Sequence, residues 1–201
     1  MKKIFLITAV MSMIGFSEVQ AQTDNMGTES DTTETIYDND GPNFSKIDVS
    51  PLDVILFRGD NDDPVARVLY SRPQMRGREI FGSLVPYGEV WRTGANEATE
   101  ITFYTDMMIE GKKIDAGTYT LFTIPKEDEW VIILNNSTHI WGAYDYFQEK
   151  DLARITVPVR ESPVTIEALS MAFEPTENGM ELVIGWADKF VRVPFTNPEK
   201  V

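Results

Sequence analysis

The sequence predicts an all-β fold: a single-domain antiparallel β sandwich, jelly-roll-like and with little helix. From Lys46 onward, apolar and polar residues alternate with a period of two, as in half-buried strands. Short turn-forming segments separate these runs. No run of a dozen residues has the apolar spacing of an amphipathic helix. Several short strands at close spacing are typical of a sandwich or a barrel.

The strands can be placed in order along the chain. Ile101 and Phe103 are expected to face the core from a strand over residues 100–105. Further strands are expected at residues 118–123, 130–134, 153–159, 164–173, 180–186 and 190–195. Turns at residues 125–128 and 174–179 predict two hairpins. Pro158 indicates an edge strand, because proline has no backbone N–H to donate to a neighbour. One short helical turn is expected within residues 141–152.

Residues 1–21 have the features of a secretory signal peptide. Lys2 and Lys3 precede an uncharged apolar segment, residues 4–16, and Val19-Gln20-Ala21 has the small-x-small pattern of a cleavage site. The apolar segment is shorter than the roughly 20 residues that a membrane helix needs. With no cysteine after the cleavage site, a lipoprotein anchor is not expected. These features predict a periplasmic or secreted protein without membrane insertion.

Residues 22–45 are expected to form a disordered acidic spacer. They contain six acidic residues and no lysine or arginine, and they are too polar to bury a core. The predicted sandwich domain, residues 46–201, follows. The net charge of the whole chain is −14, which disfavours nucleic acid as a partner.

The residue inventory excludes several kinds of catalytic centre. The chain has no cysteine and a single histidine, His139, which lies in a polar stretch typical of an exposed loop. It therefore lacks an HExxH zinc motif, a thiolate metal site and a cysteine nucleophile. It also lacks a P-loop, a GxGxxG motif and a GxSxG elbow. Neither a metal nor a cofactor is predicted.

The most unusual segment is VPYGEVWRTGANEATEITF, residues 85–103. Gly94 permits a backbone conformation with positive φ, which few other residues tolerate. The Arg92 guanidinium has a planar set of donors that matches a carboxylate or a pair of carbonyl groups. Aromatic faces and hydrogen-bond donors together suit a small polar ligand with a ring, such as a carbohydrate. The candidate ligand-binding residues are Tyr70, Arg72, Trp91, Arg92, Asn96, Glu97 and Trp141.

Three alternatives to this interpretation remain open. Glu97 is a candidate general acid or base, which would make the protein a hydrolase. A second alternative is a structural role: the arginine, asparagine and glutamate side chains would hydrogen-bond to the backbone of an irregular loop and so hold that loop against a sheet. Separately, the domain is a candidate structural envelope module that binds another protein through an exposed sheet edge.

Three stretches together carry a family resemblance. They are YSRPQMRGREIFGSLVPYGEVWRTGANEATEITF, IEGKKIDAGTYTLFTIPKEDEWVIILN and WGAYDY. Across residues 46–195 the chain resembles a bacterial exported family known as domain of unknown function 2911. The matching positions include Tyr70 to Pro73 and the central motif from Pro86 to Ala98. The resemblance implies export and a β-rich domain, and it implies no established activity.

Overall fold

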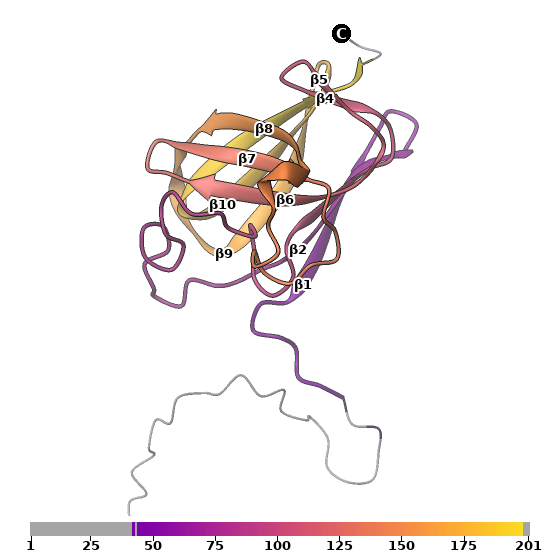
Figure 1. Cartoon of the computed structure of the whole chain (residues 1–201). Coiled ribbons are helices and arrows are strands. Elements are labelled where there is room, and N and C mark those ends of the chain that lie inside the picture. The colour runs from indigo at the N-terminus through magenta and orange to yellow at the C-terminus, as the bar shows by residue number, and fades with distance from the viewer. Residues whose placement is uncertain (1–41, 43, 199–201) are drawn as a thin grey trace, which may run out of the picture.

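The computed structural model describes residue 42 and residues 44–198, and it confirms an all-β sandwich (Figure 1). Two antiparallel sheets pack against each other around one main core. The predicted signal peptide and most of the predicted spacer lie outside the described residues, so the divisions at residues 21 and 45 stay predictions. In the described part of the chain, no helix is long and apolar enough to cross a membrane.

The larger sheet has six antiparallel strands. In spatial order they are β1 (Leu52–Arg58), β2 (Pro64–Ser71), β3 (Glu100–Phe103), β6 (Gly117–Pro125), β7 (Glu129–Asn135) and β8 (Asp151–Pro158). The predicted hairpin is confirmed as β6–β7, with Leu121 opposite Leu134. Strand β8, which ends at Pro158, lies at the sheet edge as predicted. The predicted helical turn is a 3-10 turn at Gln148–Lys150.

The smaller sheet has the order β5 (Lys112–Ile114), β4 (Met107–Ile109), β10 (Gly179–Thr196) and β9 (Arg160–Thr176). The second predicted hairpin is confirmed as β9–β10, with Gly179 opposite Thr176. The strand predicted at residues 190–195 is the second half of β10.

Strand β10 doubles back on itself. Its 18 residues would span about 60 Å if they were fully extended. Instead, the Asn197 N–H just after the strand donates to the Asn178 carbonyl just before it, at 2.7 Å. The backbone at Ala187, near the middle, takes a left-handed φ of 56°, and the pairing with β9 shifts register there. The two halves of β10 therefore lie side by side, and Gly179 comes against Phe195 and Thr196.

The main core fills the space between the sheets. Ile101 and Phe103 face it as the alternation predicts, and Trp130 and Trp186 are fully buried in it. A second, smaller core lies on the other face of β6 and β7. There, Phe122 and Ile133 are covered by residues 140–146, and the Tyr146 ring meets Phe122 edge-on at 5.1 Å. The middle of this hairpin is therefore buried on both faces.

Candidate functional site

The loop between β2 and β3, residues 72–99, lies at the lower left of Figure 1. It forms most of the lining of a pocket of about 420 Å³. Backbone hydrogen bonds hold this loop to both sheets. The Pro73 carbonyl accepts from Leu169 on β9, and Trp91 exchanges two bonds with Thr123 on β6, at 2.7 and 3.0 Å. Trp186 of β10 and the segment Val49–Ser50 complete the pocket wall. The loop is thus fixed at both of its halves.

Trp91 forms the aromatic wall of this pocket. Its indole stacks on that of Trp186, with 6.0 Å between ring centroids and 17° between planes, and meets Trp130 edge-on at 6.2 Å. The indole N–H donates to the Gly94 carbonyl at 3.1 Å. A Cβ on residue 94 would lie 3.2 Å from Thr99 Oγ1, so glycine permits this close packing. The Trp91 ring is therefore held in one orientation.

Arg92 lines the pocket next to Trp91. Its Nε is buried and has no hydrogen-bond partner among the described residues, and none of the ion pairs there includes it. A buried donor without an acceptor costs about 1–3 kcal/mol of stability. The neighbouring Thr93 is fully buried with a left-handed φ of 55°, which is unfavourable for a β-branched residue. The loop thus carries two destabilising features beside the pocket.

We expect Arg92→Met to raise the free energy of unfolding by about 1 kcal/mol, because it removes the unsatisfied donor and keeps an apolar side chain of similar length. Denaturant unfolding would measure the change. Arg67→Met is the matched control, since Arg67 is an exposed arginine on β2, and its effect should stay within about 0.5 kcal/mol. A clear loss of stability in Arg92→Met would instead mean that Arg92 holds the loop in place.

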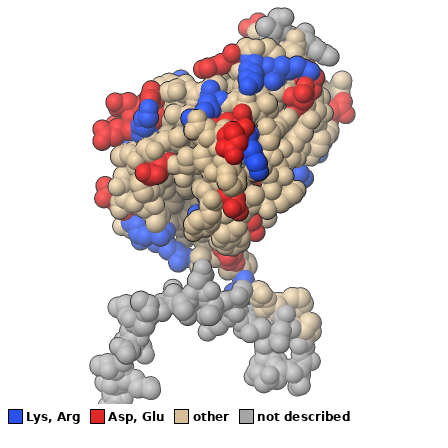
Figure 2. Space-filling view, viewed as in Figure 1, with Lys and Arg blue, Asp and Glu red and all other residues tan. Residues whose placement is uncertain are grey.

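Two further arginines, Arg76 and Arg78, line the same pocket. Arg78 donates through Nε to the Met75 carbonyl at 3.0 Å and through Nη2 to the Gln74 carbonyl at 2.6 Å. The Arg76 backbone N–H donates to Glu167 Oε1 at 2.9 Å. Figure 2 shows basic side chains gathered at the lower left, over the β2–β3 loop. Neither arginine is among the residues predicted from sequence, although their closeness to Arg72 in an acidic chain was an available signal.

Tyr70 and Arg72, both predicted as ligand-binding residues, lie outside this pocket. Tyr70 is buried in the core, and its hydroxyl accepts from the Met171 N–H at 3.1 Å. Arg72 pairs with Asp53 at 3.1 Å and donates to the Leu169 carbonyl and to Ser170 Oγ. These contacts join β1 and the end of β2 to β9. In the structure both residues connect the two sheets.

Burial raises the pKa of Tyr70 above its ordinary value. The folded state therefore keeps the phenol proton to a higher pH than the unfolded state does. This contribution to stability is complete below about pH 10 and is lost as the pH rises through the pKa of the folded state. We expect Tyr70→Phe to be less stable at pH 8 but to lose less stability between pH 8 and 10.5. Urea unfolding at both values checks this, and equal losses in the two proteins would contradict it.

The C-terminal part of the β2–β3 loop, which includes Asn96 and Glu97, lies next to Trp141. The Glu97 backbone forms a β-bridge with Trp141, and the Asn96 carbonyl accepts from Gly142 at 3.0 Å. Both the Glu97 and Trp141 side chains are exposed, and neither lines the pocket. Asn96 Nδ2 donates to Asp48 at 3.2 Å, which ties the adjacent segment Val49–Ser50 to the pocket wall. The ligand-binding roles of these residues stay predictions.

His139 is exposed, as the sequence indicates. Its backbone N–H donates to Glu100 Oε1 at 2.6 Å, and its Nδ1 lies 3.3 Å from the same oxygen. Glu100 lies on β3 and does not line the pocket that contains Arg76, Arg78 and Arg92. Among the described residues, no group of three or more histidine, cysteine or carboxylate side chains is placed to hold a metal ion.

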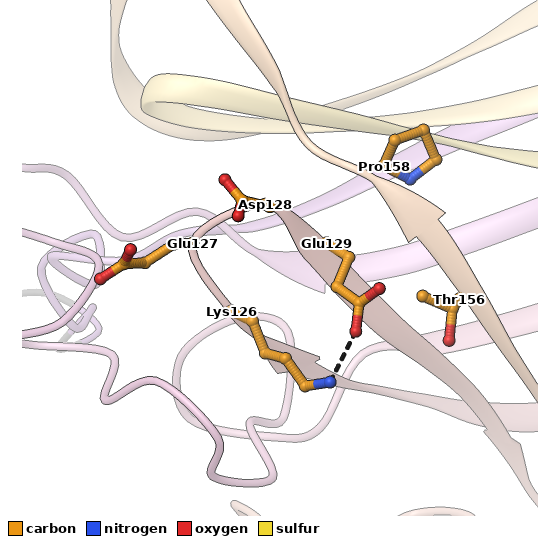
Figure 3. Close-up of a pocket in the computed structure, with 6 residues that line it drawn as sticks. All are labelled: Lys126, Glu127, Asp128, Glu129, Thr156 and Pro158. Carbon is orange, nitrogen blue, oxygen red and sulfur yellow. Dashed lines mark hydrogen bonds and ion pairs between the residues drawn. The ribbon is translucent and has the colours of Figure 1, made fainter.

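A second hollow, of about 590 Å³, lies at the turn between β6 and β7 (Figure 3). Lys126 Nζ pairs with Glu129 at 2.6 Å, while Glu127 and Asp128 point away from that pair. The Asp128 carbonyl accepts from Val159, which secures the turn. Among the residues that the structure describes, no aromatic side chain lines this hollow, and its one lysine pairs with Glu129. We therefore place the candidate site in the arginine pocket.

Comparison with known proteins agrees with the sequence motifs. The family model described as "Protein of unknown function (DUF2911)" matches residues 55–195, which include every strand of both sheets except the ends of β1 and β10. Searches of curated proteins and of solved structures gave no match. The matched region contains the whole β2–β3 loop and nearly all of the pocket lining. The chain belongs to the DUF2911 family.

Proposed function

We propose that this domain binds a small polar ligand with a ring, a carbohydrate, in the pocket between the β2–β3 loop and Trp186. The observation that carries the proposal is that a fixed indole, Trp91, lines the pocket beside Arg92, whose side chain forms no ion pair and whose Nε forms no hydrogen bond among the described residues. Aromatic rings pack on the C–H faces of sugars, and guanidinium donors meet their oxygens. The pocket volume lies within the range of about 300–1,000 Å³ that is usual for small-molecule sites.

Binding without catalysis fits this pocket better than hydrolysis does. Glycoside hydrolysis normally needs two carboxyl groups on either side of the scissile bond. The lining contains no aspartate or glutamate among the described residues, and Glu97 lies outside it. The donors of Arg92 suit the recognition of oxygen atoms, and an arginine does not act as a general base because it stays protonated.

Calorimetry and ligand-observed NMR on the chain that begins at Gln22 would test binding against a panel of mono- and oligosaccharides. We expect saturable binding of at least one sugar, with Arg92→Met weakening it about tenfold, as for the loss of a charged hydrogen bond. Arg67→Met should bind as the wild type does. The absence of binding to every sugar, or equal binding by both variants, would overturn the proposal.

We also propose that the protein is exported and functions in the periplasm or outside the cell. The support is the basic start, apolar segment and cleavage pattern of residues 1–21. Mass spectrometry of the protein from a bacterial host should find a mature N-terminus at Gln22 in the periplasmic fraction. A full-length chain confined to the cytoplasm would contradict export.

A further inference from the structure

We propose that the ligand of this pocket carries a carboxylate, so that the natural ligand is an acidic sugar of the uronic acid class. This inference rests on the proposed carbohydrate site and names the group that the site selects. Three arginines, Arg76, Arg78 and Arg92, line one pocket, and no carboxylate of the described residues lines it with them. Neutral sugars do not need such a concentration of positive charge.

No described carboxylate forms an ion pair with the guanidinium groups of these arginines, although Glu167 Oε1 accepts from the Arg76 backbone N–H at 2.9 Å. Arg58, Arg72, Arg154 and Arg192 all form ion pairs with aspartate or glutamate. The described ion pairs include none with Arg76, Arg78 or Arg92 in the pocket, and none with the exposed Arg67 and Arg160 outside it. Of the nine described arginines, five therefore have no described ion-pair partner, and three of these five line one pocket. Their grouping around one pocket indicates that an external anion takes that place.

The arginine geometry suits a carboxylate on a bound ring. Carbonyl acceptors hold Nε and Nη2 of Arg78, which fixes the guanidinium but leaves its charge and its Nη1 group available. Arg92 lines the pocket beside Trp91, where the sugar ring is proposed to pack. Its Nε is buried, so a ligand would meet its Nη groups. Guanidinium groups bind carboxylates through two parallel charged hydrogen bonds, which are about twice as strong as neutral ones. One side of the pocket thus binds the ring and the other binds its acid group.

Because the protein as a whole is acidic, it can bind an anionic ligand only where basic side chains lie close to that ligand. At −14, the molecule as a whole repels an anion. Screening limits that repulsion to about 8 Å at physiological ionic strength, so the nearest charges decide whether an anion binds. Within the pocket the nearest charges are arginines. We therefore expect acid selectivity here in spite of the acidic surface.

The test compares matched sugars on the chain that begins at Gln22. D-Galacturonate and D-glucuronate, with their dimers, are titrated by calorimetry beside galactose, glucose and the corresponding neutral dimers. Sodium acetate and inorganic sulfate test whether an anion alone is enough. The double variant Arg76→Gln, Arg78→Gln removes two of the three charges, and Arg67→Gln is the control for an exposed arginine elsewhere. Thermal unfolding of each variant verifies that it is folded.

We expect the acidic sugars to bind at least about tenfold more tightly than their neutral counterparts, as for one charged hydrogen-bonded pair. The double variant should lose this preference and keep its affinity for neutral sugars, and Arg67→Gln should change neither. Equal affinities for acidic and neutral sugars would overturn the inference and leave the carbohydrate site standing. Acetate or sulfate binding as tightly as the acidic sugars would overturn both the inference and the ring recognition. Failure of every sugar to bind would overturn the proposed function itself.

Discussion

Replacing Gly179 with alanine is expected to lower the free energy of unfolding by about 3 kcal/mol, the upper part of the range for overpacking. The added Cβ would collide with the Phe195 carbonyl oxygen and would lie 2.8 Å from Thr196 Cα. These are backbone atoms of the second half of β10, and they cannot move aside as the end of a flexible side chain can. Relief would require the two halves of β10 to separate, which would disturb the pairing with β9 and the fully buried Phe195.

Thermal and denaturant unfolding of Gly179→Ala would measure this effect, with an expected fall in Tm of about 6–12 °C for a domain of this size. Gly111→Ala is the control. Gly111 lies in an open turn with nothing within 4 Å of an added Cβ, but its φ of 76° makes alanine unfavourable by about 1–2 kcal/mol. If Gly179→Ala were no more harmful than Gly111→Ala, the close approach of the two halves of β10 would be wrong.

Trp91→Ala is expected to cost about 3–5 kcal/mol, as for other large-to-small changes of aromatic residues in cores. The half-buried indole packs against the main core, where it contacts Trp186, Trp130 and Phe81. Alanine would leave a cavity among these rings. It would also remove the bond from the indole N–H to the Gly94 carbonyl, so the loop over the pocket would lose an anchor.

Denaturant unfolding would measure the stability of Trp91→Ala, and near-UV circular dichroism would report the loss of the stacked Trp91–Trp186 pair. Trp141→Ala is the control, because the Trp141 side chain is 60% exposed and should contribute less than about 0.5 kcal/mol. Similar costs for the two variants would mean that Trp91 adds nothing to the core. The milder change Trp91→Phe should recover part of the stability, since it refills most of the cavity.

Strands β3 and β6 to β10 were predictable because half-buried strands leave a local signal, whereas β1, β2, β4 and β5 were not predicted. Ile101 and Phe103 alternate with polar residues and do face the core. The burial of Phe122 and Ile133 on the opposite face was not predictable in the same way, because it depends on cover from residues 140–146. Likewise, the sequence separates residues 180–186 from 190–195 but does not indicate that these two strands lie side by side. Such contacts between distant segments leave no period in the sequence.

The candidate site was predictable only in part. Trp91 and Arg92 stand out because they occur in an irregular segment between strands, and both line the pocket. Arg76, Arg78 and Trp186 also line the pocket, but they were not among the residues predicted from the sequence. Trp186 belongs to a different sheet, and the two arginines meet Arg92 only because the loop is fixed to β9 and β6. Conversely, Tyr70 and Arg72 look like site residues in the sequence, yet their partners are Met171, Asp53, Leu169 and Ser170 in the structure.

The β2–β3 loop joins two strands that pair directly with each other, Val68 on β2 opposite Ile101 on β3. The entropic cost of closing a loop rises only with the logarithm of its length. Doubling the length of this loop would therefore lower the free energy of unfolding by only about 0.6 kcal/mol. Related domains can therefore change the length of the exposed part of this loop, such as residues 76–79, without changing the sandwich that carries it. Ile80, Phe81 and Val85 of the same loop are buried in the main core, and the family motif spans Pro86 to Ala98. We therefore expect divergence of specificity within the family to concentrate at the exposed residues 76–79, which include Arg76 and Arg78.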